Sequence, residues 1–215
     1  MSEFETSLQE QFGFHNPIDI DELILDDFWD AKESLNEEEK LGLEKYKNLI
    51  HLSLNNLKIK TLKNFPSIKI LYFLSINGNE LNGDDLDLIP KLYPKLSKLK
   101  IGNNKIENIE CFSKLKCLNL RKIEVKGNPF VEKEEKYIDK LFEMIPSLKI
   151  IDNKNKEGNT EETTDYHKNE EESEDEDFGE DKEKSEENDD YEDDNDDEYE
   201  GGEDSDEEND SKEKK

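Results

Sequence analysis

The chain has few of the residues that indicate a secreted, metal-binding or disulfide-stabilised protein. Its 215 residues include two cysteines, Cys111 and Cys117, which have no histidine near them. Their spacing fits neither a zinc site nor a CxxC redox pair. We therefore expect two reduced thiols that pack as small hydrophobic groups or lie half exposed.

The sequence also lacks a long hydrophobic run. Its longest apolar cluster, residues 68–76, is interrupted by Lys69 and is much shorter than the roughly 20 residues that a membrane span needs. The opening residues, MSEFETSLQEQF, are acidic and have no basic segment followed by an apolar one, so they do not form a secretory signal. These features predict a soluble, intracellular protein.

No arrangement of catalytic residues is visible in the sequence. The histidines, His15, His51 and His167, lie far apart, and nothing places a nucleophile beside a base. The sequence contains neither a GxxxxGK[ST] phosphate-binding loop nor an HExxH metal-binding helix. We therefore predict a protein that is not an enzyme and that has no catalytic residues, cofactor or metal site.

What the sequence has in excess is negative charge near its C-terminus. The formal net charge is −29, and residues 158–215 hold 31 acids and 6 bases, which leaves 28 acids and 24 bases for residues 1–157. Ordering one residue costs about 1–2 kcal/mol of backbone entropy, and this acidic segment has too few apolar side chains to offset that cost. We predict a folded domain over residues 1–157 and a disordered acidic tail over residues 158–215.

Two serines of the tail stand in acidic surroundings. Ser173 is followed by Glu-Asp-Glu and Ser205 by Asp-Glu-Glu, the contexts that an acidophilic kinase prefers. Phosphorylation would add roughly −1.5 to −2 charges at each site. Both serines are candidate phosphorylation sites, and the alternative is that they are incidental residues of a disordered segment.

Residues 1–157 repeat the apolar pattern L-x-x-L-x-L-x-x-N-x-L, which is typical of leucine-rich repeats. Copies begin at residues 20, 49, 71, 96, 120 and 148. Successive copies are therefore 22 to 29 residues apart, within the 20 to 29 residues expected of this repeat class. The first, second and last copies diverge or stop early. We predict an α/β fold, a leucine-rich repeat solenoid in which a curved parallel sheet forms the concave face. Three copies fit the pattern fully: Leu71, Leu74, Ile76, Asn79 and Leu81; Leu96, Leu99, Ile101, Asn104 and Ile106; Leu120, Ile123, Val125, Asn128 and Phe130.

A solenoid needs a cap at each end, because its terminal repeats would otherwise expose an apolar face. At the N-terminal end, Phe4, Leu8 and Phe12 fall on one face of a short amphipathic helix. At the C-terminal end, we expect a helix that starts at Asn128-Pro129 and stops before Pro146. Its apolar stripe comprises Tyr137, Ile138, Leu141, Phe142 and Ile145.

The asparagines of the pattern have a predicted structural role. In this fold, an inward amide side chain binds backbone groups that are left unpaired where a strand turns out of the sheet. We expect Asn79, Asn104 and Asn128 to act in this way. Leu57 occupies the same position in the second copy, so that turn must be satisfied by other means or be looser.

Side chains between the core leucines are expected on the concave face, because side chains alternate along a strand. Their charge changes from acidic through polar to basic along the repeats. From the first copy onward they are Glu22, Ile24 and Asp26; His51, Ser53 and Asn55; Phe73, Ser75 and Asn77; Lys98, Lys100 and Gly102; Lys122, Glu124 and Lys126.

We predict a partner-binding site on this face, with Phe73 as apolar anchor and lysines that contact acidic groups. The chain's own tail is one acidic candidate for those lysines. The alternative is that the face is only a solvated surface. The predicted site comprises His51, Phe73, Ser75, Lys98, Lys100, Lys122, Glu124 and Lys126.

With its repeats, caps and acidic tail, the chain resembles the acidic leucine-rich nuclear phosphoprotein 32 family. Residues 17–26, PIDIDELILD, are similar to the family's opening repeat; residues 71–76, LYFLSI, resemble an early strand; residues 142–152, FEMIPSLKIID, resemble its closing cap. The resemblance implies a histone-binding, chromatin-associated adaptor of the nucleus and cytoplasm. Some members of that family also inhibit a type-2A serine/threonine phosphatase, so the resemblance implies this activity as a second possibility for the chain.

The chain departs from that family in its tail. The tail contains Asn, Lys and Tyr among its acids, and the family's basic nuclear-import stretch is reduced to Lys212, Lys214 and Lys215. We still expect a nuclear protein with a cytoplasmic pool.

A disordered polyanion competes with nucleic acid for basic proteins, and salt weakens its binding. Histones or other basic proteins are therefore the expected partners, whereas direct binding to nucleic acid or to an anionic membrane is disfavoured by charge. We expect a histone-binding adaptor or chaperone. The alternative is a regulatory inhibitor whose concave sheet binds a protein phosphatase.

Overall fold

The structure is a computed structural model that describes residues 3–13, 16–28 and 33–160. The chain divides into two compact units, Met1–Tyr166 and His167–Lys215, and all described residues belong to the first. The predicted phosphorylation sites Ser173 and Ser205, and the tail beyond Thr160, lie outside the described residues.

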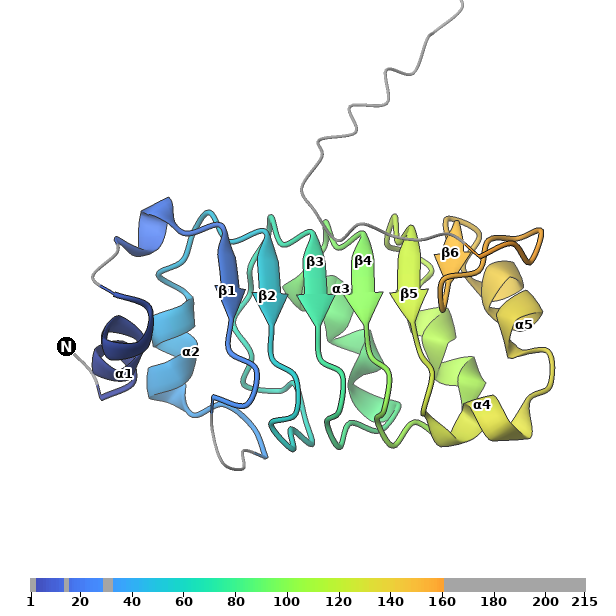
Figure 1. Ribbon diagram of the computed structural model, residues 1–215, viewed down its shortest axis with the longest axis horizontal. Coiled ribbons are helices and arrows are strands. Elements are labelled where there is room, and N and C mark those ends of the chain that lie inside the picture. The colour runs from blue at the N-terminus through green and yellow to red at the C-terminus, as the bar shows by residue number, and fades with distance from the viewer. Residues whose placement is uncertain (1–2, 14–15, 29–32, 161–215) are drawn as a thin grey trace, which may run out of the picture. The chain divides into compact units, whose positions relative to one another are not determined.

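A single parallel sheet of six strands runs through the described part of the chain, with the strands in chain order from β1 to β6 (Figure 1). Each strand pairs in parallel with the strand of the next repeat, which confirms the predicted leucine-rich repeat fold. The strands are β1 (Glu22–Ile24), β2 (His51–Ser53), β3 (Phe73–Ser75), β4 (Lys98–Lys100), β5 (Lys122–Glu124) and β6 (Ile150–Ile151).

The strand register explains how the apolar pattern builds the core. The central residues of the strands pair with one another in one row and are buried, so they form one wall of the core. The residues on either side of them face the opposite side of the sheet, as the two-residue period of a strand requires. The central row is Leu23, Leu52, Leu74, Leu99, Ile123 and Ile151.

Short helical segments connect the strands and cap the ends. In Figure 1, α3 lies behind the sheet, α1 and α2 lie beside β1, and α5 lies beside β6. The α-helices are α1 (Glu3–Phe12), α2 (Glu37–Leu43), α3 (Ile89–Leu92), α4 (Pro129–Lys133) and α5 (Tyr137–Met144). The 3-10 helices are η1 (Pro17–Asp19), η2 (Asp84–Asp87) and η3 (Ile109–Leu115).

The N-terminal cap packs α1 against α2. Phe4 and Leu8 are buried, as predicted for the apolar face of this helix, whereas the side chain of Phe12 lies outside the described part. A Cβ atom on Gly42 would lie 2.6 Å from the Phe4 ring, so the ring packs directly on the backbone of α2. A capping box starts α2, because the Asn36 side chain accepts from the Glu39 amide at 2.9 Å and the Glu39 carboxylate accepts from the Asn36 amide at 2.8 Å.

The C-terminal cap corrects one prediction. The single helix expected after Asn128 is two helices, α4 and α5, because the backbone at Glu134 is extended (φ −116°, ψ 94°). The predicted apolar stripe of α5 still packs on the core. Beyond β6, the Asn155 side chain accepts from the amides of Glu157 and Asn159, and the domain boundary after Glu157 stays a prediction.

The three asparagines are buried and bind backbone groups of two successive repeats. The Asn79 Oδ1 atom accepts from the amides of Leu57 and Ile59, both at 3.0 Å, and its Nδ2 atom donates to the carbonyls of Leu54 and Ile76. The turn that contains Leu57 is therefore satisfied by the asparagine of the following repeat. Asn104 and Asn128 make the equivalent bonds: Asn104 accepts from Leu81 and donates to Ile76 and Ile101; Asn128 accepts from Ile106 and donates to Ile101 and Val125.

Asp152 occupies a similar place in the last turn. Its Oδ1 atom accepts from the amides of Val125, at 2.8 Å, and Lys126, at 3.2 Å. Its Oδ2 atom accepts a hydrogen bond of 2.9 Å from the Tyr137 hydroxyl on α5. Burial and the neighbouring Asp152 carboxylate raise the pKa of Tyr137. This contact joins the last helix to the last turn.

The turn after each strand contains a residue with positive φ, and asparagine and glycine alternate at this position in the middle repeats. A Cβ atom on Gly78 would lie 2.1 Å from the Asn56 Oδ1 atom, and one on Gly127 would lie 2.1 Å from the Asn103 Oδ1 atom. Each asparagine thus fills the space beside the glycine of the next repeat. The series is Asp27, Asn56, Gly78, Asn103 and Gly127, and in the last turn Asp152 and Asn153, nearer to the strand, have positive φ instead.

Candidate partner-binding surface

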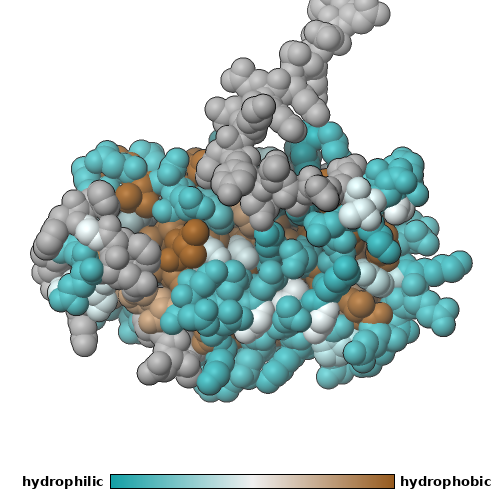
Figure 2. All heavy atoms as spheres, in the orientation of Figure 1, coloured by the Kyte–Doolittle hydropathy of each residue, from teal (hydrophilic) through white to brown (hydrophobic). Residues whose placement is uncertain are grey.

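The predicted site residues lie together on one face of the sheet, which we call the open face. It consists of the first and third residues of the strands and the residues two positions further along the chain. Figure 2, in the orientation of Figure 1, shows many hydrophilic side chains and an apolar patch toward the N-terminal end. The first row is Glu22, His51, Phe73, Lys98, Lys122 and Ile150; the second is Ile24, Ser53, Ser75, Lys100 and Glu124; the third is Asp26, Asn55, Asn77, Gly102 and Lys126.

Aromatic and charged groups contact one another at the centre of the first row. The His51 and Phe73 rings are stacked, with centroids 4.2 Å apart and an interplanar angle of 13°. The His51 Nδ1 atom lies 2.5 Å from a Glu22 carboxylate oxygen, and the Lys100 Nζ atom lies 5.4 Å from the Phe73 ring centroid, within cation–π range. Phe73 is only 9% exposed, so the predicted apolar anchor presents less surface than we expected.

Two exposed apolar side chains near this face were not among the predicted site residues. Tyr72, 44% exposed, precedes β3, and the Lys98 Nζ atom lies 5.7 Å from its ring centroid. Ile24, 47% exposed, is in the second row of the open face. The alternation of side chains already put Ile24 on this face, but Tyr72 lies just outside the strand and had no such signal.

A hydrogen-bond ladder runs along the third row. The Asp26 side chain accepts from the Asn55 amide at 2.9 Å, the Asn55 side chain accepts from the Asn77 amide at 2.7 Å, and the Asn77 side chain accepts from the Gly102 amide at 2.6 Å. The Ser75 hydroxyl donates to the Asn55 side chain and is buried. Ser75, a predicted partner-binding residue, thus uses its hydroxyl within the domain.

The ladder ends at Gly102, which has no side chain to continue it. A Cβ atom there would lie 2.8 Å from the Lys126 carbonyl, so the close approach of the two turns requires glycine. The Asn77 Nδ2 atom donates instead to Glu124 of β5, at 3.4 Å. Glu124 is therefore engaged with Asn77, whereas Lys126 at the end of this row is exposed.

The charge of the domain changes sign along the repeats. Residues 1–45 contain 14 acids and 3 bases, and residues 46–157 contain 14 acids and 21 bases. The open face follows this change, since Glu22 and Asp26 lie at the β1 end and the four predicted lysines lie on or after β4 and β5. Lys122 is buried, so it contributes less exposed surface than the sequence predicts.

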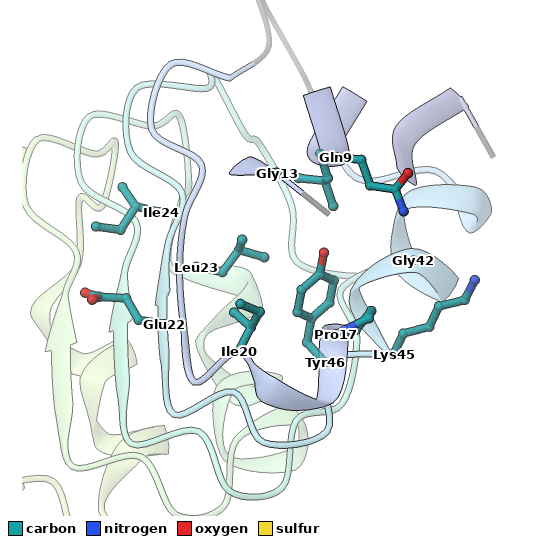
Figure 3. Close-up of a pocket in the computed structure, with 11 residues that line it drawn as sticks. Gln9, Gly13, Pro17, Ile20, Glu22, Leu23, Ile24, Gly42, Lys45 and Tyr46 are labelled. Carbon is teal, nitrogen blue, oxygen red and sulfur yellow. The ribbon is translucent and has the colours of Figure 1, made fainter. Parts of the chain in front are cut away.

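An apolar pocket lies at the N-terminal end of the sheet (Figure 3). It has a volume of about 460 Å³, within the range of small-ligand and side-chain pockets. Most of its lining is apolar, and sequence reasoning did not find it because four separate elements form it. The lining residues are Leu8, Gln9, Gly13, Pro17, Ile20, Glu22, Leu23, Ile24, Gly42, Lys45 and Tyr46.

The described residues contain no group of three or more His, Cys, Asp or Glu side chains that could hold a metal ion. Burial raises the pKa of the Cys111 thiol to about 11, and its Sγ atom donates to the Asn108 carbonyl. Cys117 is exposed, and neither cysteine forms a disulfide.

Of the histidines, His51 lies on the open face, whereas His15 and His167 lie outside the described residues. Within the same residues, no helix has both the length and the apolar character to cross a membrane.

The repeated strands, the buried asparagines Asn79, Asn104 and Asn128, and the two caps define a leucine-rich repeat protein.

No family model matches the chain. An acidic leucine-rich nuclear phosphoprotein 32-related protein of Plasmodium falciparum (isolate 3D7) is 42% identical over 141 residues, which are 65% of this chain and 49% of that protein. Acidic leucine-rich nuclear phosphoprotein 32-related protein 1 of Caenorhabditis elegans is 34% identical over 141 residues, 64% of this chain and 58% of that protein.

These relatives confirm the predicted resemblance to the acidic leucine-rich nuclear phosphoprotein 32 family. The chain spans about half the length of the curated relatives it matches. Their names are those of nuclear phosphoproteins and not of enzymes, which agrees with the predicted nuclear localisation. A protein of Tetrahymena thermophila that is named as a histone is also similar, with 32% identity over 120 residues, 55% of this chain and 30% of that protein.

Among solved structures, a chain of the Drosophila melanogaster SNF/U2A' complex is similar, with a TM-score of 0.45 and 19% sequence identity. The match covers 54% of this chain and 65% of that chain.

Proposed function

We propose that this protein is a non-enzymatic, histone-binding adaptor or chaperone that associates with chromatin in the nucleus. The acidic tail binds basic proteins, and the repeat domain adds selectivity. The observation that carries this proposal is the charge of residues 158–215, which hold 31 acids and 6 bases, against 28 acids and 24 bases in the rest of the chain.

Electrostatics gives the tail its function in this proposal. Clustered carboxylates attract cationic proteins over about a Debye length, roughly 8 Å at physiological salt, and they raise association rates. A polyanion of this kind displaces basic proteins from nucleic acid and does not bind nucleic acid itself, because both are anions. Histones and other basic nuclear proteins are the partners with matching charge.

The relatives support the same class of function. Several are named nuclear phosphoproteins, and part of this chain is similar to part of the Tetrahymena thermophila protein that is named as a histone. The histone name supports a link to chromatin.

Removal of the tail tests the proposal. A chain that ends at Thr160 should lose most of its affinity for core histones at low salt, whereas the full chain should bind them and release them as salt rises. A matched control keeps the composition of residues 161–215 and scrambles their order, and it should retain binding because charge density is unchanged. Equal histone affinity with and without residues 161–215 would contradict the proposal.

The second candidate function, regulatory inhibition of a type-2A phosphatase, depends on the open face and not on the tail. The exposed Tyr72 ring beside Lys98 offers an aromatic and a cationic group for a protein partner. In this case, the chain that ends at Thr160 should still inhibit the phosphatase, and Tyr72→Ala with Lys98→Ala should abolish inhibition. Loss of inhibition on tail removal alone would contradict this candidate.

A further inference from the structure

The strand β1 is at the edge of the sheet and has a neighbouring strand on one side only. On that side, the His51 amide donates to the Asp21 carbonyl and the Leu25 amide donates to the Ser53 carbonyl. In a parallel ladder, alternate residues direct their backbone groups to opposite sides, so Asp21, Leu23 and Leu25 face β2 and Glu22 and Ile24 face away from it. Glu22 and Ile24 thus present backbone donors and acceptors at the edge, where an added strand could pair.

The apolar pocket lies directly along this edge. All three residues of β1 line it, and Tyr46, just after α2, lies across the cavity from Leu23 (Figure 3). The pocket volume of about 460 Å³ is sufficient for one large side chain of a bound segment. Ile24 is 47% exposed beside the pocket, so apolar surface continues from the cavity onto the strand.

The charge around the edge favours a basic occupant. Residues 1–45 contain 14 acids and 3 bases. Lys45 lines the pocket as well, but the acids outnumber it at the strand itself. The acidic side chains next to or within β1 are Asp19, Asp21, Glu22, Asp26 and Asp27, and of these all but the half-buried Asp26 are exposed.

We infer that the edge of β1 binds an extended basic peptide, with one large apolar side chain in the pocket and basic side chains against the surrounding carboxylates. This inference rests on the proposed function, since it assigns the selectivity of the repeat domain to its acidic N-terminal end. The backbone pairing supplies affinity for any extended segment. The pocket and the carboxylates select a basic segment that carries an apolar residue.

The test uses the full chain and two ten-residue, lysine-rich peptides, one with a leucine at its centre and one with serine there. The acidic tail attracts both equally, so the ratio of the two dissociation constants isolates the pocket. We expect the leucine peptide to bind about tenfold more tightly, because it buries one large apolar side chain. Amide chemical shifts of Glu22 and Ile24 should change on binding, and those of β5 should not.

Two variants of the full chain locate the binding site. Ile24→Pro removes an outward amide that β2 does not use, a change that edge strands tolerate, and Ile24→Thr is the matched control that keeps this amide. Gln9→Trp fills the pocket from α1 without changing β1. The leucine preference should disappear in Ile24→Pro and Gln9→Trp and should persist in Ile24→Thr, with folding checked in the same spectra.

Equal affinity for the two peptides, or a leucine preference that survives both variants, would overturn the inference. A dimer in sedimentation equilibrium that Ile24→Pro dissociates would also overturn it, because the occupant would then be a second copy of β1. Histone binding that needs residues 161–215 tests the proposed function separately. Failure of the peptide result alone therefore rejects only the assignment to β1.

Discussion

The two ends of the repeat domain differ in charge and in how their turns are closed. The N-terminal end is acidic, has an apolar pocket beside an edge strand, and has Leu57 where later repeats have asparagine. The C-terminal end is basic, and buried Asn104, Asn128 and Asp152 bind its turns. The comparison indicates that each later repeat contributes a buried polar side chain to the turns, whereas the repeat of Leu57 contributes none and depends on Asn79 of the following repeat.

The largest effect should come from removing a buried asparagine. Asn104→Ala leaves the Leu81 amide and the carbonyls of Ile76 and Ile101 without this partner, and each unsatisfied buried group costs about 1–3 kcal/mol. We expect a loss of about 3 kcal/mol in the free energy of unfolding, measured by urea denaturation. Asn159 is the control because its side chain is exposed, and Asn159→Ala should cost about 0.5 kcal/mol or less. Similar losses for the two variants would contradict the stabilising role of the buried asparagines.

An intermediate effect is expected where asparagine packs over glycine. Gly127 has φ +78°, and a Cβ atom there would lie 2.1 Å from the Asn103 Oδ1 atom, so Gly127→Ala should cost about 2 kcal/mol of unfolding free energy. In an Asn103→Gly background, the same change should cost about 1 kcal/mol, because only the backbone strain remains. A double-mutant cycle measures this coupling, and equal costs in the two backgrounds would contradict the packing argument.

The smallest effect should separate two tyrosines. Tyr137 donates to Asp152, so Tyr137→Phe should cost about 1 kcal/mol at neutral pH. The Tyr93 hydroxyl is fully buried and has no hydrogen-bond partner among the described residues. Tyr93→Phe should therefore leave the stability unchanged or raise it.

The same pair predicts a pH dependence. The pKa values of both tyrosines are raised in the folded state, mainly by burial. The unfolded chain therefore ionises first, near pH 10, and stability present below that pH is lost as the pH rises further. Each Phe variant should reduce this alkaline loss in urea titrations. An unchanged slope in both variants would indicate that neither phenol is protected from ionisation.

The sequence predicts those parts of the fold that depend on a local pattern. The strands, the buried leucines and the positions of Asn79, Asn104 and Asn128 all follow from one repeat written several times. The break between α4 and α5 at Glu134 does not follow from it, because the predicted apolar stripe begins at Tyr137, after the break, and gives no signal for it.

The candidate site was less predictable, since it depends on side chains from different repeats. Strand alternation put His51, Phe73 and Ser75 on the open face. It could not show that His51 stacks on Phe73 or that Asn55 uses the Ser75 hydroxyl. The pocket was missed for the same reason, because α1, η1, β1 and the end of α2 supply its walls.

The alternation of asparagine and glycine in the turns also sets a rule for changing the number of repeats. Because Asn56 fills the space beside Gly78 and Asn103 that beside Gly127, neighbouring repeats are matched as pairs. Deleting residues 57–78 would bring the Asn103 side chain against Asn56, where the structure has a glycine. Duplicating two repeats would preserve this alternation in the middle of the domain, whereas the first two turns have no glycine and are joined by a hydrogen bond of 3.5 Å from the Asn56 side chain to Asp27.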